Sequence, residues 1–230
     1  MARKARFTPA GIPQHIIQRG VDRQLCFGCE ADFKAYLYWL KVYSEKHQVS
    51  IHAWVLMTNH VHLLCTPSSA EGISKMMQSL GRSYVRYFNY HHQRTGTLWE
   101  GRFKASLVNA SEYLLNLYRY IELNPVRANM VKNPADYVWS SYQCNALGRK
   151  SPLLTPHDLY LALDSSPIVR QGLYRSLFTN QVEGALLEDI RYATNRGLVL
   201  GSESFVVKLE ALCGRRLREG LKGRPKKNVH

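Results

Sequence analysis

The stretch IHAWVLMTNHVHLLCTP, residues 51–67, decides the fold, because a polar pair separates two apolar runs in it. The runs predict two strands, at residues 50–57 and 59–66. Thr58 and Asn59, where the two strands meet, suit a tight hairpin turn. The chain is therefore expected to contain an antiparallel hairpin at this point.

The second run carries two histidines one residue apart. Successive side chains of a strand point to opposite faces of its sheet, so His60 and His62 share one face while Val61 and Leu63 take the other. Two imidazoles then stand side by side, as two ligands of one metal ion would. A strand histidine is more often a core residue with satisfied hydrogen bonds, so the pair alone leaves both interpretations open.

The rest of the N-terminal part supplies the elements around this hairpin. They are a strand at 14–19, an amphipathic helix at 31–47, a helix with the apolar stripe Ile73, Met77, Leu80, Tyr84 and Phe88, a half-buried strand at 102–109, and a helix from an N-cap at Ser111 to Asn124. The order β-α-β-β-α-β-α is that of a ferredoxin-like split βαβ fold. We therefore expect an α+β domain with a central antiparallel sheet and helices packed on one face.

Beyond about residue 133 the pattern weakens, and prolines punctuate helical segments near 156–163, 168–178 and 182–196. This part reads as a helical extension rather than a second catalytic unit. The predicted organisation is a domain at 1–145, a helical extension at 146–213 and a basic flexible tail at 214–230.

The amino-acid composition limits the classes of partner and the cellular location that we expect for this protein. The 31 Lys and Arg against 17 Asp and Glu give a formal charge of +14, which suits a partner rich in phosphate. No apolar run approaches the length of a membrane span and no signal-peptide core is present, so we expect a cytoplasmic protein without membrane contact. The five cysteines are scattered, which predicts reduced thiols, and we interpret the CxxC of Cys26 and Cys29 as structural.

The helix after Ser111 carries a tyrosine and an amide that face the same way. Tyr120 and Asn124 are one turn apart, so Asn124 could offer a carbonyl oxygen to a metal with the Tyr120 phenol beside it. Alternatively, Tyr120 packs by its ring and Asn124 caps the helix before Pro125. Tyr118 is the nearest rival, but two residues along a helix rotate by about 200°, and Tyr118 falls on the apolar stripe.

These motifs together resemble those of a known protein family. The HVH of residues 60–62 resembles the HUH motif, and YRYIELNPVRA resembles the tyrosine helix of single-tyrosine HUH transposases. Together with RFTPAGIPQHIIQRG and GTLWEGRFKA, the pattern over residues 1–145 is similar to the REP-associated tyrosine transposases. HUH alone is a weak pattern, but HUH followed some sixty residues later by YIELNPVRA is a strong one.

The resemblance implies an enzyme that cleaves and rejoins single-stranded DNA, such as hairpin-forming palindromic repeats, through a covalent 5′-phosphotyrosine. It makes Tyr120 the nucleophile and assigns Mg²⁺ or Mn²⁺ to His60, His62 and Asn124, where many relatives outside the branch have Gln in place of Asn124. The tyrosine could act in its own chain or in the partner of a homodimer, because both arrangements occur among HUH transposases. Two other functions stay open: a catalytically silent DNA-binding protein, and a nuclease that activates water.

Basic residues gather where DNA would have to pass. Those expected to contact DNA are Arg3, Lys4, Arg6, Arg19, Arg23, Arg82, Arg86, Arg102, Lys104 and Arg127, and Trp99, with Tyr90 and Phe103, is expected to stack on unpaired bases. Each could equally be a solvated or core side chain.

Overall fold

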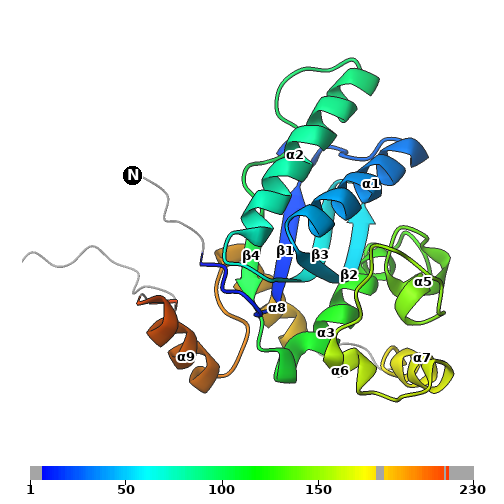
Figure 1. Cartoon of the computed structure of the whole chain (residues 1–230). Helices are drawn as coiled ribbons and strands as arrows, with labels where there is room; N and C mark the ends of the chain where they lie inside the picture. The colour runs from blue at the N-terminus through cyan, green and yellow to red at the C-terminus, as the bar shows by residue number, and fades with distance from the viewer. Residues whose placement is uncertain (1–6, 180–183, 215, 218–230) are drawn as a thin grey trace, which may run out of the picture.

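The computed structural model describes residues 7–179, 184–214 and 216–217, and its centre is a four-stranded antiparallel sheet. The strands are β1 (Gln14–Arg19), β2 (Val49–Met57), β3 (His60–Pro67) and β4 (Lys104–Leu107), in the spatial order β2-β3-β1-β4. Every neighbouring pair is antiparallel. This is the order of a ferredoxin-like sheet, so the predicted fold is confirmed (Figure 1).

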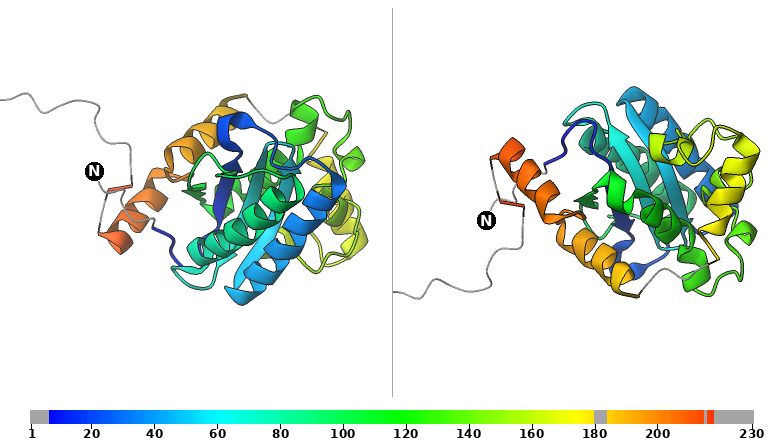
Figure 2. Two further views of the ribbon diagram at one scale, coloured as in Figure 1. Left: turned by 90° about the horizontal axis from the view of Figure 1, so that it is seen from above. Right: turned by 90° about the horizontal axis from the view of Figure 1, so that it is seen from below.

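One face of the sheet is covered by α1 (Glu30–Lys46) and α2 (Gly72–His91), which lie side by side across it (Figure 2). The predicted stripe of α2 is buried throughout and packs on the β3 residues Val61, Leu63 and Cys65. On the other side of α2, Arg82 and Arg86 are exposed. The histidine face of β3 is therefore turned away from these two helices.

The other face is covered by α3 (Ala110–Glu122) and α8 (Gly184–Arg196), so the expectation of helices on one face holds only for the ferredoxin-like part. Helix α3 packs on β2 and β3, and α8 packs on β4 and β1. The N-cap of α3 is Asn109 and not the predicted Ser111, whose hydroxyl instead donates to the Asn109 side chain at 2.9 Å. The helix therefore begins one residue before Ser111.

Besides α8, the chain beyond α3 forms a series of helices, α4 (Asn124–Arg127), α5 (Tyr142–Asn145), α6 (Asp158–Leu161), α7 (Pro167–Ser176) and α9 (Glu203–Cys213), with a turn of 3₁₀ helix at Pro134–Asp136. Another 3₁₀ turn, Val21–Arg23, lies between β1 and α1. The three predicted helical segments are present, whereas α9 was not expected. Tyr160 and Tyr174 are buried in the same hydrophobic cluster as α3. The extension thus shares a core with the preceding domain, and the division at residue 145 stays a prediction.

A buried carboxyl group joins α3 to this extension. Glu122 is fully buried and accepts hydrogen bonds from Ser141 Oγ at 2.5 Å, Asn145 Nδ2 at 2.8 Å and Tyr174 Oη at 2.6 Å. Burial raises the pKa of Glu122 to about 7, although the three donors act in the opposite direction. Sequence patterns gave no sign of this network, because its partners lie far apart in the chain.

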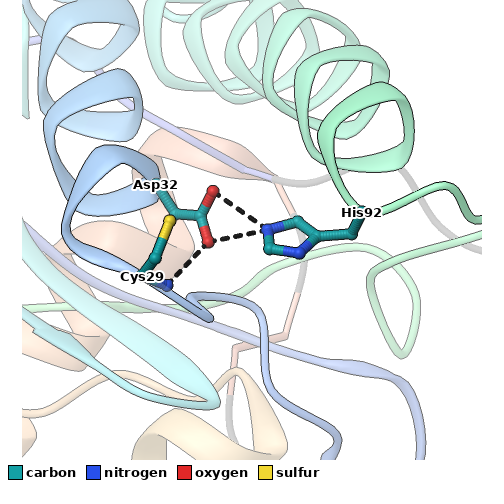
Figure 3. Close-up of side chains that lie close together, drawn as sticks. All are labelled: Cys29, Asp32 and His92. Carbon is teal, nitrogen blue, oxygen red and sulfur yellow. Dashed lines mark hydrogen bonds and ion pairs between the residues drawn. The ribbon is translucent and has the colours of Figure 1, made fainter.

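A second polar cluster fastens α1 to α2 (Figure 3). Asp32 Oδ2 accepts the backbone N–H groups of Gly28 and Cys29 at 2.7 and 3.1 Å and contacts His92 Nε2 at 2.9 Å. Cys29 and Asp32 form a capping box at the start of α1, while His92 follows the end of α2. These contacts give Cys29 a role at the start of α1, and Cys26 is buried in the core.

Among the described residues, no helix combines the length and apolar character that crossing a membrane requires.

Candidate active site

The two histidines of β3 lie next to each other on the face that α3 covers. Their ring centroids are 5.0 Å apart with an angle of 76° between the ring planes. His60 Nδ1 contacts Asn59 Oδ1 at 2.6 Å, and His62 Nδ1 is also engaged in a hydrogen bond. The Nε2 atom of each ring is thus left for another ligand, as the prediction of a metal site requires.

The partner of His62 is a third imidazole, which sequence reasoning missed. His15 on β1 is completely buried, and its Nε2 lies 2.9 Å from His62 Nδ1. The two rings are stacked, with centroids 5.1 Å apart and planes at 13°. Strand alternation places His15 on one face of β1, but only the pairing of β1 with β3, in which Ile17 lies opposite His62, brings the two histidines together. The sequence carries no signal for that register.

Tyr120 on α3 reaches the same place within the same chain. Its ring centroid lies 5.7 Å from that of His62 and 5.6 Å from that of His15, in edge-to-face geometry. The rival Tyr118 turns away and packs with Tyr160 and Tyr174 at centroid distances of 6.2 and 6.0 Å. The helical rotation argument therefore selected the tyrosine that faces the histidines.

Arg127 contacts both the ring and the backbone of Tyr120. Its guanidinium carbon lies 4.5 Å from the centroid of the Tyr120 ring, and Nη2 donates to the backbone carbonyl of Tyr120. Among the described residues, Arg127 Nη1 is buried and has no hydrogen-bond partner. Burial lowers the pKa of Arg127 to about 10, which leaves the group charged at neutral pH. A buried cation with an unpaired donor beside a phenol suits an anionic ligand.

Asn124 is the first residue of α4, two residues beyond the end of α3, and its side chain bonds the last turn of α3, as the capping alternative describes. Its Nδ2 donates to the carbonyl oxygens of Tyr120 at 2.9 Å and Ile121 at 3.2 Å. These two bonds use the nitrogen of the amide and fix the side chain at the base of the tyrosine. The role of Asn124 as a metal ligand through Oδ1 stays a prediction.

The buried imidazoles are neutral at physiological pH. Burial lowers the pKa of His15 to about 3 and that of His60 to about 4, and places the pKa of His62 well below its usual value. A metal binds only the unprotonated ring nitrogen, so this environment keeps the rings ready to act as ligands.

The same shifts predict loss of stability in acid. Below about pH 6.5 the unfolded chain takes up protons on histidines that the folded chain leaves neutral, so the free energy of unfolding falls as the pH drops toward 4. His52, with a pKa lowered to about 4, adds to this effect, while Glu122, with a raised pKa, opposes it. Urea denaturation at pH 7.5, 6 and 5 should give steadily smaller free energies of unfolding. Equal values at the three pH settings would contradict the prediction.

A basic cleft lies beside the histidines. It has a volume of about 210 Å³, and Arg19, Arg102 and Lys104 line it with Glu100 as the acidic member. Strand pairing sets Arg19 opposite His60. A second cleft of about 790 Å³, along α2, is lined by Arg82 and also by Arg102, which connects the two. Four of the residues predicted to contact DNA thus converge on adjoining clefts.

Other predicted contacts are placed differently. Trp99 is 7% exposed and packs against Tyr36 and Tyr84, and Phe103 is equally buried. Both residues line the cleft along α2, and their stacking on a base stays a prediction. Tyr90 is 75% exposed and stays a candidate. Arg23 is exposed in the turn after β1, and Arg86 is exposed on α2. Arg3, Lys4 and Arg6 lie outside the described residues.

Comparisons with known proteins bear on the family and the fold. The family model described as "Transposase IS200 like" matches residues 11–124. A structure of a REP-associated tyrosine transposase bound to a REP hairpin has a TM-score of 0.52 and 17% identity, covering 68% of this chain and 93% of that chain. At this identity the likeness concerns the fold alone.

A provisionally assigned transposase from Deinococcus radiodurans R1 is a more distant match, with a TM-score of 0.36 and 16% identity over 51% of this chain and 95% of that chain. Its similarity is too low to carry an argument. No curated protein sequence matches this chain.

Proposed function

Residues 11–124 of this chain belong to the IS200-like transposase family, and from this premise we propose that the protein cleaves and rejoins single-stranded DNA with Tyr120 as the nucleophile. The observation that carries the proposal is the approach of the Tyr120 ring to within 5.7 Å of the His62 ring in one chain. A nucleophile and candidate metal ligands thus meet without help from a second subunit. We therefore propose that the tyrosine acts on the site of its own chain.

The proposed step is a transfer of a phosphoryl group to tyrosine. The phenol oxygen of Tyr120 attacks the phosphorus, a new O–P bond forms, and the bond to the 3′ oxygen of the preceding nucleotide breaks. The phenol loses one proton and the departing oxygen gains one, which leaves a free 3′-OH and a 5′-phosphotyrosine. Attack by a 3′-OH on that ester reverses the step and joins strands, so no external energy source is required.

His60 and His62 are the residues that we propose hold Mg²⁺ or Mn²⁺, with Oδ1 of Asn124 as a third ligand. The engaged Nδ1 atoms support this assignment, because they leave Nε2 as the nitrogen through which each ring can bind a metal. A divalent ion bound there would act as a Lewis acid toward a phosphate oxygen. Two neutral imidazoles and an amide leave the charge of the ion intact, which suits an anionic substrate.

Arg127 is proposed to contact the scissile phosphate. Nη1 of Arg127 has no hydrogen-bond partner among the described residues, and the same guanidinium lies over the Tyr120 ring. A phosphate that approaches the phenol would therefore meet this donor. A charge-assisted bond from a guanidinium to a phosphate oxygen would stabilise the charge that develops as the phenol attacks. The backbone contact of Nη2 keeps the guanidinium in place before DNA arrives.

We propose single-stranded DNA, in the form of hairpin repeats, as the substrate, and the REP-associated branch as the nearest group within the family. The adjoining basic clefts support a polyanionic ligand next to Tyr120. The structure with a similar fold contains a REP hairpin, which is a property of that protein. Here the same class of ligand is consistent with the charge of +14.

The test is a covalent-capture assay. The protein is incubated with a single-stranded hairpin, labelled on the side 3′ of the candidate cleavage sites, in the presence of Mn²⁺, and is then run on a denaturing gel. The expected result is a labelled adduct that EDTA prevents. Cleavage without an adduct would favour hydrolysis by activated water, and DNA binding without cleavage would favour a silent binding protein. Either outcome overturns the proposal.

DNA affinity should depend on salt through the basic clefts. Each neutralised phosphate contributes about 0.7 to the slope of log affinity against log salt for a single strand. Arg102→Ala removes the residue shared by both clefts, so it should weaken binding and lower that slope by about 0.7 per lost contact. Lys34→Ala is the matched control, because Lys34 is exposed on α1 and pairs with Glu30. Fluorescence anisotropy over a salt series measures both, and equal slopes for the two variants would contradict the assignment.

A further inference from the structure

A chain of buried hydrogen bonds runs from α8 to the candidate metal ligand. Thr194 Oγ1 donates to the carbonyl of Ile190 at 2.8 Å and lies 2.9 Å from His15 Nδ1. The other nitrogen of His15 lies 2.9 Å from His62 Nδ1. Thr194 and His15 are 0% exposed and His62 is 3% exposed, so these bonds are shielded from solvent.

The direction of each bond follows from the number of available protons. Thr194 has one hydroxyl proton, and when Ile190 O takes that proton the Thr194 oxygen accepts from His15 Nδ1. Neutral His15 then carries its proton on Nδ1 and offers a lone pair at Nε2. His62 must therefore donate from Nδ1, which leaves the lone pair of His62 on Nε2.

Resting on the proposed metal site, we infer that His15 and Thr194 are positioning residues that hold His62 in the tautomer needed for metal binding. Burial, which lowers the pKa of His15, supports the neutral form that this arrangement needs. The stacked rings of His15 and His62 fix the orientation of the ligand as well as its proton. Helix α8 of the extension is thereby part of the support of the site, although it contributes no ligand. Removing the hydrogen-bond partner of a metal-binding histidine lowers metal affinity by about 10-fold to 100-fold.

The Ser106 hydroxyl does not replace Thr194 in this role. Ser106 Oγ lies 3.3 Å from Thr194 Oγ1, and strand pairing sets Ser106 opposite His15 on the neighbouring strand. His15 Nδ1 lies 2.9 Å from Thr194 Oγ1, which makes the threonine hydroxyl its hydrogen-bond partner. Removing the Thr194 hydroxyl would therefore leave His15 Nδ1 without its acceptor.

The direct test reads the tautomer in the metal-free protein. Nitrogen-detected NMR of the ¹⁵N-labelled full chain at pH 7.5 should show His62 protonated on Nδ1 and unprotonated on Nε2. Thr194→Val should shift that signal toward a mixture of tautomers, while Thr194→Ser should restore the wild-type pattern. Protonation of wild-type His62 on Nε2 would overturn the inference, and this measurement needs no variant.

The second test measures Mn²⁺ affinity by titration with EPR detection of the free ion. Thr194→Val is expected to weaken binding by about tenfold or more, and Thr194→Ser by much less. The matched control is Thr179→Val. The Thr179 hydroxyl also bonds a helix carbonyl, at 2.7 Å, but it is exposed to solvent. Unchanged affinity in Thr194→Val overturns the inference. Failure of the wild-type protein to bind Mn²⁺ would instead count against the proposed function, so the two failures are distinguishable.

Discussion

Tyr120→Phe is expected to abolish the covalent adduct with single-stranded DNA. The substitution removes only the phenol oxygen, which is the proposed nucleophile, so adduct formation should fall by at least about three orders of magnitude. The ring remains, and with it the edge-to-face contacts to His15 and His62 and the stacking under Arg127. DNA affinity, measured by anisotropy, should therefore stay close to that of the wild type.

Tyr118→Phe provides the matched control for this prediction. Tyr118 lies two residues earlier on the same helix and packs among the aromatic rings of the extension, away from the histidines. Removing its hydroxyl should leave the adduct at nearly the wild-type level. An adduct that survives in Tyr120→Phe but disappears in Tyr118→Phe would reverse the assignment. Cleavage that persists in both variants without an adduct would point to water as the nucleophile.

Glu122→Ala is expected to cause the largest loss of stability. Glu122 accepts hydrogen bonds from Ser141, Asn145 and Tyr174 in a site closed to solvent, and alanine would leave all three donors without this acceptor. Each unsatisfied buried group costs about 1–3 kcal/mol, so the free energy of unfolding should fall by about 3–5 kcal/mol. Urea denaturation measures the change. Glu188→Ala, at an exposed position on α8, should stay within about 0.5 kcal/mol of the wild type.

Glu122→Gln separates the hydrogen bonds from the charge. The pKa of Glu122 is raised to about 7, so between pH 4.5 and 7 the folded chain keeps a proton that the unfolded chain has released. The contribution of this group to stability therefore falls as the pH rises through that window. Glutamine is neutral throughout, so the variant should gain about 2–3 kcal/mol relative to the wild type between pH 4.5 and pH 8. A constant difference across this range would show that the carboxyl group does not titrate as described.

The sequence predicted the N-terminal fold well because its signals are local. The hairpin shows as two apolar runs separated by a polar pair, and the stripe of α2 repeats at helical spacing. Both patterns depend on neighbours within a few residues. The same kind of argument selected Tyr120 over Tyr118, because rotation along a helix follows from counting residues.

The missed features depend on partners that are distant in the chain. His15 joins the site only through the register of β1 on β3, and Thr194 only through the packing of α8 on β4. Ser106 alternates with apolar residues along its strand, yet it is 1% exposed because α8 packs on β4. Trp99 was predicted to stack on DNA because it is aromatic and near basic residues, and its packing against Tyr36 and Tyr84 could not be read from the sequence. None of these packings has a periodic signature in the sequence.

The hydrogen bond between His15 and Thr194 joins residues 179 positions apart in the chain. A ribosome delivers the first of them long before the second, and segments made earlier generally fold as they emerge. The hairpin and its histidines can therefore assemble while His15 still lacks its partner on α8. We expect the nascent protein to acquire its final arrangement of imidazoles only after translation has passed α8, so a translation product truncated before α8 would lack that arrangement.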